Sequence, residues 1–366
     1  MHLQKLQLGN FKNYERAEVD FPSKINVLVG KNGSGKTNLL EAVYYLSFTK
    51  GAVVATDSYY IKEGQAGFHL RGTYQMAGAT HTLSCGVHTG TKKIFREDDR
   101  DYPRLSDHIG KYPATLVAPD DVDLVKEGGE QRRKFFDALI SQIDHQYLEA
   151  LMKYNHALKQ RNGLLRLFQH KPLDVGAIEA YDQVLVPLGK SIYQLRQRFV
   201  QEFTPVFTRY YDFLVSHEEA AGLEYVSALA DVDFDEGLKR NRMKDLALQR
   251  TAFGIHRDDF KFILGEGDLK KMGSQGQQKS FVIAMKLAQW ELLKIHKGFD
   301  PILLLDDIFD KLDDYRIGQL LELIRTDFGQ LFITDARPDR TQGLLRQVHL
   351  EASVFEVYQG TIRTKN

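Results

Sequence analysis

This 366-residue sequence has only one cysteine and no excess of charge of either sign. The single cysteine, Cys85, excludes an intramolecular disulfide framework and a cysteine-based metal cluster, and it fits a small apolar filler. The 49 basic and 49 acidic residues cancel, so any attraction to nucleic acid has to come from local basic patches. A hydrophobic content of 43% is enough to bury the cores of one large domain and one smaller domain.

Long apolar runs are absent as well, and their absence bears on the location of the protein in the cell. None approaches the roughly 20 residues that a bilayer-spanning helix needs. Residues Met1–Leu6 lack the basic region and the uninterrupted apolar core of a secretion signal. We therefore expect a soluble cytoplasmic protein with no membrane partner.

Hydrophobic periodicity predicts an α/β domain that both ends of the chain build together. Residues 25–29 form a short β-rich run, residues 38–48 follow with helical spacing, and an α/β pattern returns from Thr251. The middle of the chain, about 131–209, is mostly helical in pattern. We expect three segments: 1–121, the first half of the α/β domain with a β-rich lobe; 122–250, an inserted and mainly helical lobe; and 251–366, the second half.

A glycine-rich loop lies between the predicted strand and the predicted helix. Its eight residues fit the P-loop pattern G-x-x-x-x-G-K-[ST]: Gly30, Lys31, Asn32, Gly33, Ser34, Gly35, Lys36 and Thr37. The glycines let successive backbone N–H groups converge on phosphate oxygens, and the following helix adds the positive end of its dipole. We expect Lys36 to reach the β- and γ-phosphates of a nucleotide and the Thr37 hydroxyl to bind Mg²⁺.

Two adjacent carboxylates follow a second buried strand. Residues 302–305 are four apolar residues, typical of a strand buried on both faces, and Asp306 and Asp307 come directly after them. Ligands of open α/β sheets bind at this end of the strands. On its own such a pair can simply cap a loop. Combined with the P-loop, it predicts Asp306 as the metal-side acid and Asp307 as the group that polarises the attacking water.

A small polar loop before the strongly periodic helix 280–295 is the third feature. It contains Ser274, Gly276 and Gln277, and it resembles the signature loop of ABC ATPases. A serine hydroxyl, free N–H groups and the positive end of a helix dipole suit it to phosphate binding. A flexible helix cap is the other interpretation of such a loop. Its place between the other two motifs favours the signature, with Ser274 as a catalytic residue beside Lys36 and Asp307.

Further segments resemble the RecF family of bacterial recombinational-repair ATPases, and they occur in family order over nearly the whole chain. They are residues 8–14, 119–121, 132–137, 154–162 and 251–259. The resemblance implies an ABC-type P-loop ATPase head with slow, DNA-stimulated hydrolysis of ATP and Mg²⁺ as cofactor. It implies an ATP-dependent head-to-tail homodimer in which Ser274 touches the γ-phosphate in the partner's P-loop. It also implies binding to double-stranded DNA and to gap junctions between single- and double-stranded DNA, together with RecR, RecO and the RecA pathway.

The DNA contacts are expected from lysines and arginines of the helical region, where residues 151–200 carry eight Lys/Arg and three Asp/Glu. The candidates are Arg132, Arg133, Lys153, Lys159, Arg161, Arg166, Arg196 and Arg198. Such residues contact phosphates without reading sequence, so the binding should be sequence-neutral and salt-sensitive. Charge runs are equally typical of solvated helix faces. His256, beside Asp258 and Asp259, has no metal-ligand spacing to support it, and we expect a structural or DNA-facing role there.

Several positions depart from the ABC pattern, and four other functions compete. Asp307 stands where many ABC ATPases have Glu, and Thr334 and Asp335 stand where transporter ATPases place a His. An SMC-type chromosome organiser needs hundreds of heptad residues, for which this chain has no room. A transporter subunit favours that missing His, and a nuclease fusion needs an additional acidic metal domain. An SMC-like or other nucleotide-gated DNA-binding module with negligible turnover stays open, because only kinetics can separate it from an ATPase.

Overall fold

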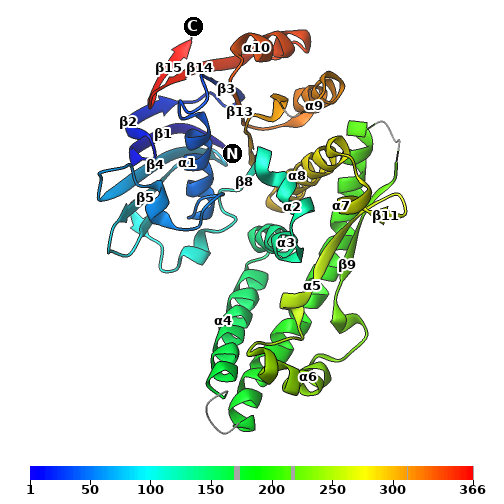
Figure 1. The fold of residues 1–366 in the computed structure, drawn as a ribbon. Coiled ribbons are helices and arrows are strands. Elements are labelled where there is room, and N and C mark those ends of the chain that lie inside the picture. The colour runs from blue at the N-terminus through cyan, green and yellow to red at the C-terminus, as the bar shows by residue number, and fades with distance from the viewer. Residues whose placement is uncertain (169–173, 216–218, 311, 366) are drawn as a thin grey trace. The chain divides into compact units, whose positions relative to one another are not determined.

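The computed structural model describes residues 1–168, 174–215, 219–310 and 312–365. Its contacts divide the chain into two compact units (Figure 1). Unit 1 consists of Met1–Val122, Tyr210–His217 and Gln275–Asn366, and unit 2 of Asp123–Arg209 and Glu218–Ser274. The two ends of the chain therefore share unit 1. Residues 251–274, which we expected in the second half of the α/β domain, belong to unit 2.

A six-stranded sheet, parallel except for β15, holds the candidate site in unit 1. Its order is β15 (Thr361–Lys365), β14 (Ala352–Tyr358), β3 (Ile25–Val29), β13 (Leu331–Asp335), β12 (Ile302–Leu305) and β8 (Ala114–Val117). Every residue of β3, β12 and β13 is buried, as is typical of parallel strands inside an α/β domain. Since β13 lies between β3 and β12, the segments that follow these three strands meet at one edge of the sheet.

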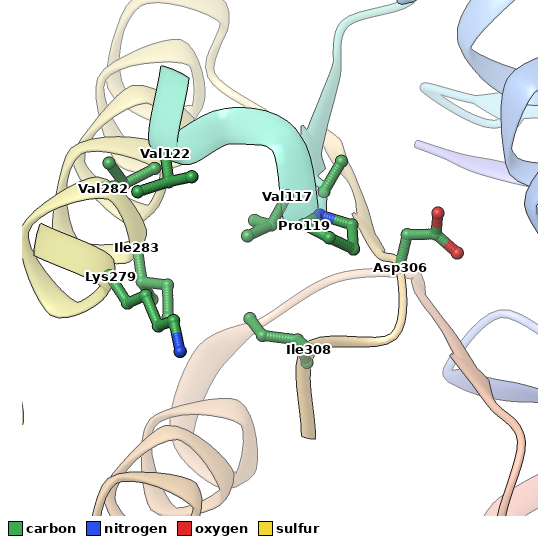
Figure 2. A pocket seen from close by; sticks show the side chains of 9 residues that line it. Val117, Pro119, Val122, Lys279, Val282, Ile283, Asp306 and Ile308 are labelled. Atoms are coloured by element: carbon green, nitrogen blue, oxygen red, sulfur yellow. The ribbon is translucent and has the colours of Figure 1, made fainter. Parts of the chain in front are cut away.

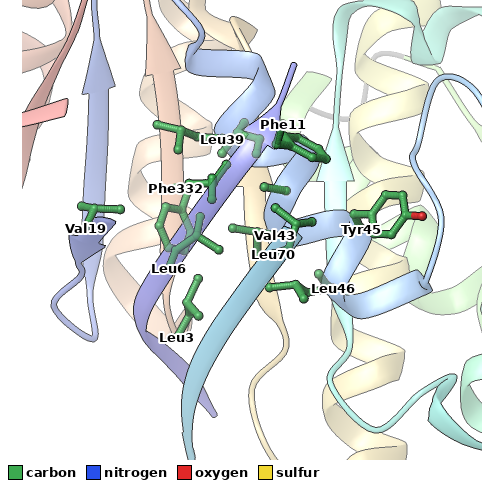
Figure 3. Packing of buried hydrophobic residues seen from close by; sticks show 14 of the residues in the cluster. Leu3, Leu6, Phe11, Val19, Leu39, Val43, Tyr45, Leu46, Leu70 and Phe332 are labelled. Carbon is green, nitrogen blue, oxygen red and sulfur yellow. The ribbon is translucent and has the colours of Figure 1, made fainter. Parts of the chain in front are cut away.

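A six-stranded antiparallel sheet forms the β-rich lobe of unit 1. Its order is β2 (Tyr14–Asp20), β1 (His2–Phe11), β4 (Gly67–Met76), β5 (Ala79–His88), β6 (Ile94–Glu97) and β7 (Arg100–Asp101). Helix α1 (Lys36–Phe48) contacts strands of both sheets. Its apolar side chains Leu39, Val43 and Leu46 pack with Leu6 and Phe332 in one buried cluster (Figure 3). Ten of the 13 residues of α1 are buried, as a helix enclosed between two sheets requires.

The remaining long helices of unit 1 come from the C-terminal part of the chain. They are α8 (Gln275–Lys297), α9 (Asp314–Asp327) and α10 (Pro338–Gln347). Helix α8 packs against the edge strand β8. Cys85 lies in the core, where burial raises the pKa of its thiol to about 12, so the expected filler role fits.

Unit 2 combines helices with a small sheet that the helical pattern did not predict. Its helices are α2 (Asp123–Lys126), α3 (Gly129–Ile143), α4 (His145–Leu167), α5 (Val175–Val215, counted with unit 2 as far as Arg209), α6 (Phe234–Leu248) and α7 (Leu269–Met272). Its sheet has the order β11 (Gly267–Asp268), β10 (Asp259–Leu264) and β9 (Ala221–Val226). The full-length pairing of β10 with β9 explains why the residues after 250 belong to this unit. Among the described residues, none of the helices is long and apolar enough to cross a membrane.

Candidate nucleotide-binding site

The P-loop connects β3 to α1, and two of its glycines are required by their geometry. Gly33 and Gly35 have φ angles of 78° and 117°, in the left-handed region that other residues rarely adopt. A Cβ on Gly35 would lie 2.7 Å from the Asn13 amide nitrogen and 2.8 Å from the Tyr14 hydroxyl. The Tyr14 hydroxyl donates to the Gly35 carbonyl (3.0 Å), and Asn13 Nδ2 donates to the carbonyl of Ser34 (2.9 Å). Asn13 in the turn between β1 and β2 and Tyr14 at the start of β2 therefore support the P-loop through hydrogen bonds to its backbone.

The side chain of Lys36 folds back onto the start of the P-loop. Its ammonium group donates to the Gly30 carbonyl at 2.8 Å and to the Lys31 carbonyl at 3.2 Å, and the residue is only 5% exposed. Both carbonyls belong to the P-loop, so the ammonium group is held against the backbone of the loop itself. The phosphate oxygens of a nucleotide would be stronger, charged acceptors for the same donors.

Asp306 and Thr37 meet although 269 residues separate them in the chain. The Thr37 hydroxyl donates to Asp306 Oδ1 at 3.0 Å. A threonine hydroxyl and a carboxylate are the hard oxygen ligands that Mg²⁺ prefers, and Mg²⁺ usually takes only one or two protein ligands beside phosphates and water. Among the described residues, no group of three or more His, Cys, Asp or Glu could hold a metal ion by itself. The donor set therefore fits Mg²⁺ bound together with a nucleotide.

The surroundings of Asp306 are mostly apolar. Burial raises the pKa of its carboxyl, while the hydroxyls of Thr334 and Thr37 and the charge of Lys36 act in the opposite direction. An apolar pocket lies beside it, and the carboxylate of Asp306 points away from the α8 residues of that pocket (Figure 2). The lining residues are Val117, Ala118, Pro119, Val122, Lys279, Val282, Ile283, Asp306 and Ile308. A buried carboxylate of this kind gains from a compensating cation.

Asp307 and Thr334 complete this edge of the sheet. Asp307 has a φ of 46°, a left-handed conformation that is uncommon outside glycine. Its backbone N–H donates to Thr334 Oγ1 at 2.9 Å, and the Thr334 hydroxyl donates to Asp306 Oδ1 at 2.6 Å. Sequence reasoning treated Thr334 only as a departure from the ABC pattern. Its position directly after the apolar residues 331–333 was the signal that could have placed it in the site.

The signature residues lie at and just before the start of α8. Ser274 is exposed and belongs to unit 2, whereas Gly276 and Gln277 lie in the first turn of α8, in unit 1. A Cβ on Gly276 would lie 3.1 Å from the guanidinium of Arg316, which is paired with Asp313. The structure thus brings together the P-loop, Asp306, Asp307 and Thr334. It assigns Ser274 to the other unit.

Two of the expected DNA contacts are wrong. Arg161 and Arg196 are 0% and 1% exposed, so neither can reach a DNA backbone. Arg161 pairs with Asp182 and Asp245, and Arg196 pairs with Asp137 and Asp258. Basic residues at helical spacing do not reveal in sequence which of them face inward.

The other basic candidates differ in exposure. Arg132 forms two hydrogen bonds of 2.8 Å with the Asp259 carboxylate, and Arg133 donates to the Asp258 carbonyl. Four candidates on α4 and α5 are exposed: Lys153, Lys159, Arg166 and Arg198. His256 has both ring nitrogens engaged, with the Tyr154 hydroxyl and the Thr251 carbonyl at 3.0 Å each, which gives it a packing role in unit 2.

The site and the sheets define a class of protein. A P-loop joined to a strand-end aspartate, with α1 shared between a largely parallel sheet and an antiparallel lobe, is the ABC-type ATPase head. The Smc head domain from Pyrococcus furiosus has this fold, with a TM-score of 0.57 over 100% of this chain and 96% of that chain; at 14% identity the likeness concerns the fold alone. The family model described as the RecF/RecN/SMC N terminal domain matches residues 2–63.

Relatives narrow the class to one family. The DNA replication and repair protein RecF of Cytophaga hutchinsonii is 44% identical over 364 residues, which are 99% of this chain and 96% of the relative. That of Flavobacterium johnsoniae is 42% identical over 98% of this chain and 100% of the relative. The structure of the recombination mediator protein RecF with ATP has a TM-score of 0.90 at 26% identity, covering 100% of this chain and 98% of that chain. The chain belongs to the RecF family of DNA replication and repair proteins.

Proposed function

We propose that this protein binds Mg-ATP, dimerises around it and thereby clamps duplex or gapped DNA during recombinational repair. The observation that carries the proposal is the hydrogen bond between Thr37 and Asp306, because it joins the phosphate loop to the metal-side acid. A RecF solved with ATP supports ATP as the nucleotide, and its place in the RecFOR pathway supports RecO and RecR as partners. The clamp assists the loading of RecA on single-stranded DNA.

Hydrolysis in this proposal is slow and releases the clamp. Lys36 binds the β- and γ-phosphates, and Asp307 polarises the water for in-line attack. Mg²⁺, when bound, supplies charge that neutralises the phosphate oxygens. Ser274 acts on the nucleotide of the other subunit, and its exposure supports such a contact in trans. The short carboxylate of Asp307 fits a slow turnover, which DNA would stimulate.

The DNA surface is proposed on α4 and α5. Lys153, Lys159, Arg166 and Arg198 are exposed there, and they would neutralise backbone phosphates without reading bases. The affinity for DNA should therefore fall steeply with salt and change little with sequence. The same proposal includes RecR and RecO as partners and a cytoplasmic location for the protein.

Light scattering with and without Mg-ATP and gapped DNA tests the clamp. We expect wild type to form dimers only with Mg-ATP, whereas Lys36→Met and Ser274→Arg stay monomeric. Ser274→Arg should still bind ATP, since Ser274 serves the partner's nucleotide, and Lys36→Met should bind it weakly. Phosphate release, compared with Asp307→Asn, separates a slow ATPase from a nucleotide-gated module with negligible turnover.

The outcome against the clamp is equally clear. A wild-type protein that binds ATP but remains monomeric with Mg-ATP and DNA would rule out the shared site. A Ser274→Arg variant that dimerises like wild type would rule out the contact in trans. The chain would then be a P-loop ATPase that works within a single subunit.

A further inference from the structure

Thr334 is the last residue but one of β13 and lies between the two strands that carry the motifs. It is fully buried, at 0% exposure. Its hydroxyl donates to Asp306 Oδ1 at 2.6 Å and accepts from the N–H of Asp307 at 2.9 Å. The single hydroxyl of Thr334 therefore donates one hydrogen bond to Asp306 and accepts another from Asp307, the two adjacent acids of the site.

The bond to Asp306 fixes the direction of that carboxylate. Oδ1 accepts hydrogen bonds from both Thr334 and Thr37, at 2.6 and 3.0 Å, so a hydroxyl from β13 and a hydroxyl from α1 hold the same oxygen. The orientation of the second oxygen follows from the first, because the carboxylate is planar. Removing the Thr334 hydroxyl would leave Oδ1 with the hydrogen bond from Thr37 alone, and rotation of the carboxylate about its Cβ–Cγ bond would be less restricted.

The bond to Asp307 fixes a backbone that is otherwise costly. A left-handed φ in a non-glycine residue is unfavourable, and it persists only where neighbouring contacts hold it. The bond from the Asp307 N–H to Thr334 is such a contact. Without the hydroxyl, this partly buried N–H would lose its acceptor, and the peptide that places Asp307 would be less well held.

We propose that Thr334 is the positioning residue for both acids, and that it does here what a ligand's outer partner does in a metal site. This inference rests on the proposed function, since it assumes that Asp306 serves Mg-ATP. Outer partners of metal ligands typically account for 10- to 100-fold in metal affinity. Thr334 therefore tunes the part of nucleotide affinity that depends on Mg²⁺, and the binding of metal-free nucleotide depends on the P-loop alone.

Four variants test the assignment. Thr334→Val removes the hydroxyl and keeps the shape, Thr334→Ala removes it with less bulk, and Thr334→Ser keeps the hydroxyl. Thr341→Val is the matched control, because Thr341 is also fully buried and its hydroxyl also donates to a buried aspartate, which is Asp335 and not Asp306. The readouts are the Kd of a fluorescent ATP analogue with Mg²⁺ and with EDTA, the Mg²⁺ concentration at half effect, and Tm.

We expect Thr334→Val and Thr334→Ala to need about tenfold more Mg²⁺, with the Kd in EDTA unchanged. Thr334→Ser should match wild type, and Thr341→Val should lower Tm without moving the Mg²⁺ requirement. Unchanged Mg²⁺ dependence in Thr334→Val or Thr334→Ala overturns the inference, and so does a shift in Thr334→Ser or an equal shift in Thr341→Val. A wild type whose ATP binding ignores Mg²⁺ would instead overturn the proposed function itself.

Discussion

Arg161 of unit 2 shows how burial turns an expected DNA-binding residue into part of an internal ion-pair network. Arg161 Nε lies 2.7 Å from Asp182 Oδ1 and its Nη1 lies 2.7 Å from Asp245 Oδ2, with all three residues buried. The cost of desolvating such charges offsets much of their attraction, so the two ion pairs of Arg161 add little net stability. Removing one partner is costly, however, because the other charges stay buried without compensation.

Replacing Arg161 by Leu should therefore lower the free energy of unfolding by about 3–5 kcal/mol. Lys159→Ala, two residues away on the same helix but exposed, should change it by no more than about 0.5 kcal/mol. Urea unfolding followed by circular dichroism measures both. Similar losses of unfolding free energy in the two variants would show that the buried ion pairs of Arg161 matter no more to stability than an exposed lysine does.

At the scale of elements, glycine decides how closely two helices of unit 2 approach. Gly189 lies within α5, and a Cβ there would fall 2.0 Å from the Phe234 ring at the start of α6. Gly163 lies within α4 with nothing within 4 Å of its Cβ position. Both are interior helical glycines, and alanine has the better helix propensity at either position. Only packing distinguishes them.

The same substitution should consequently have opposite signs at the two positions. Gly163→Ala should raise the free energy of unfolding by about 0.5–1 kcal/mol, through the helix propensity of alanine. Gly189→Ala should lower it by about 1–3 kcal/mol, because the overpacked ring has to move. Thermal and urea melts of the two variants against wild type decide the matter. Stabilisation by both would mean that α5 and α6 are not in such close contact.

At the scale of the whole molecule, each unit encloses a neutral histidine. His108 in unit 1 lies between the Leu46 carbonyl at 2.7 Å and the Tyr102 hydroxyl at 3.1 Å, and burial lowers its pKa to about 4. His256 in unit 2 likewise has its pKa lowered to about 4 by burial. Both values lie below the roughly 6.5 of an unfolded chain, so protons bind the unfolded state first.

Stability should consequently be full above pH 6.5 and decline as the pH falls toward 4. Between pH 7.5 and 5.0 each histidine should account for a loss of about 2 kcal/mol, which buried carboxyls of raised pKa, such as Asp245, offset in part. Urea unfolding at the two pH values, with His108→Gln, His256→Gln and the exposed His88→Gln as control, measures each contribution. If the slope with pH is the same in all four proteins, these histidines are not the cause.

Much of the candidate site could be predicted, because its motifs are local. The P-loop is one stretch of eight residues, and the buried strand before Asp306 is a run of four apolar residues, so each is visible in the sequence. Asn13, Tyr14 and Thr334 could not be assigned in the same way. Their roles consist of hydrogen bonds to residues far along the chain, and a turn or strand end looks the same with or without them.

The order of residues along the chain is enough to predict the kind of chemistry, since phosphate binding needs a loop, a lysine and a helix start at short spacing, and it carries the resemblance to the RecF family. Which side chains share that chemistry, and which are buried, becomes known only from the folded chain. Strand β13 lies between β3 and β12 and so places Thr334 beside Asp306, while α4, α5 and α6 enclose Arg161. Burial and long-range contact depend on how distant segments pack, and the spacing of residues along the chain does not contain that information.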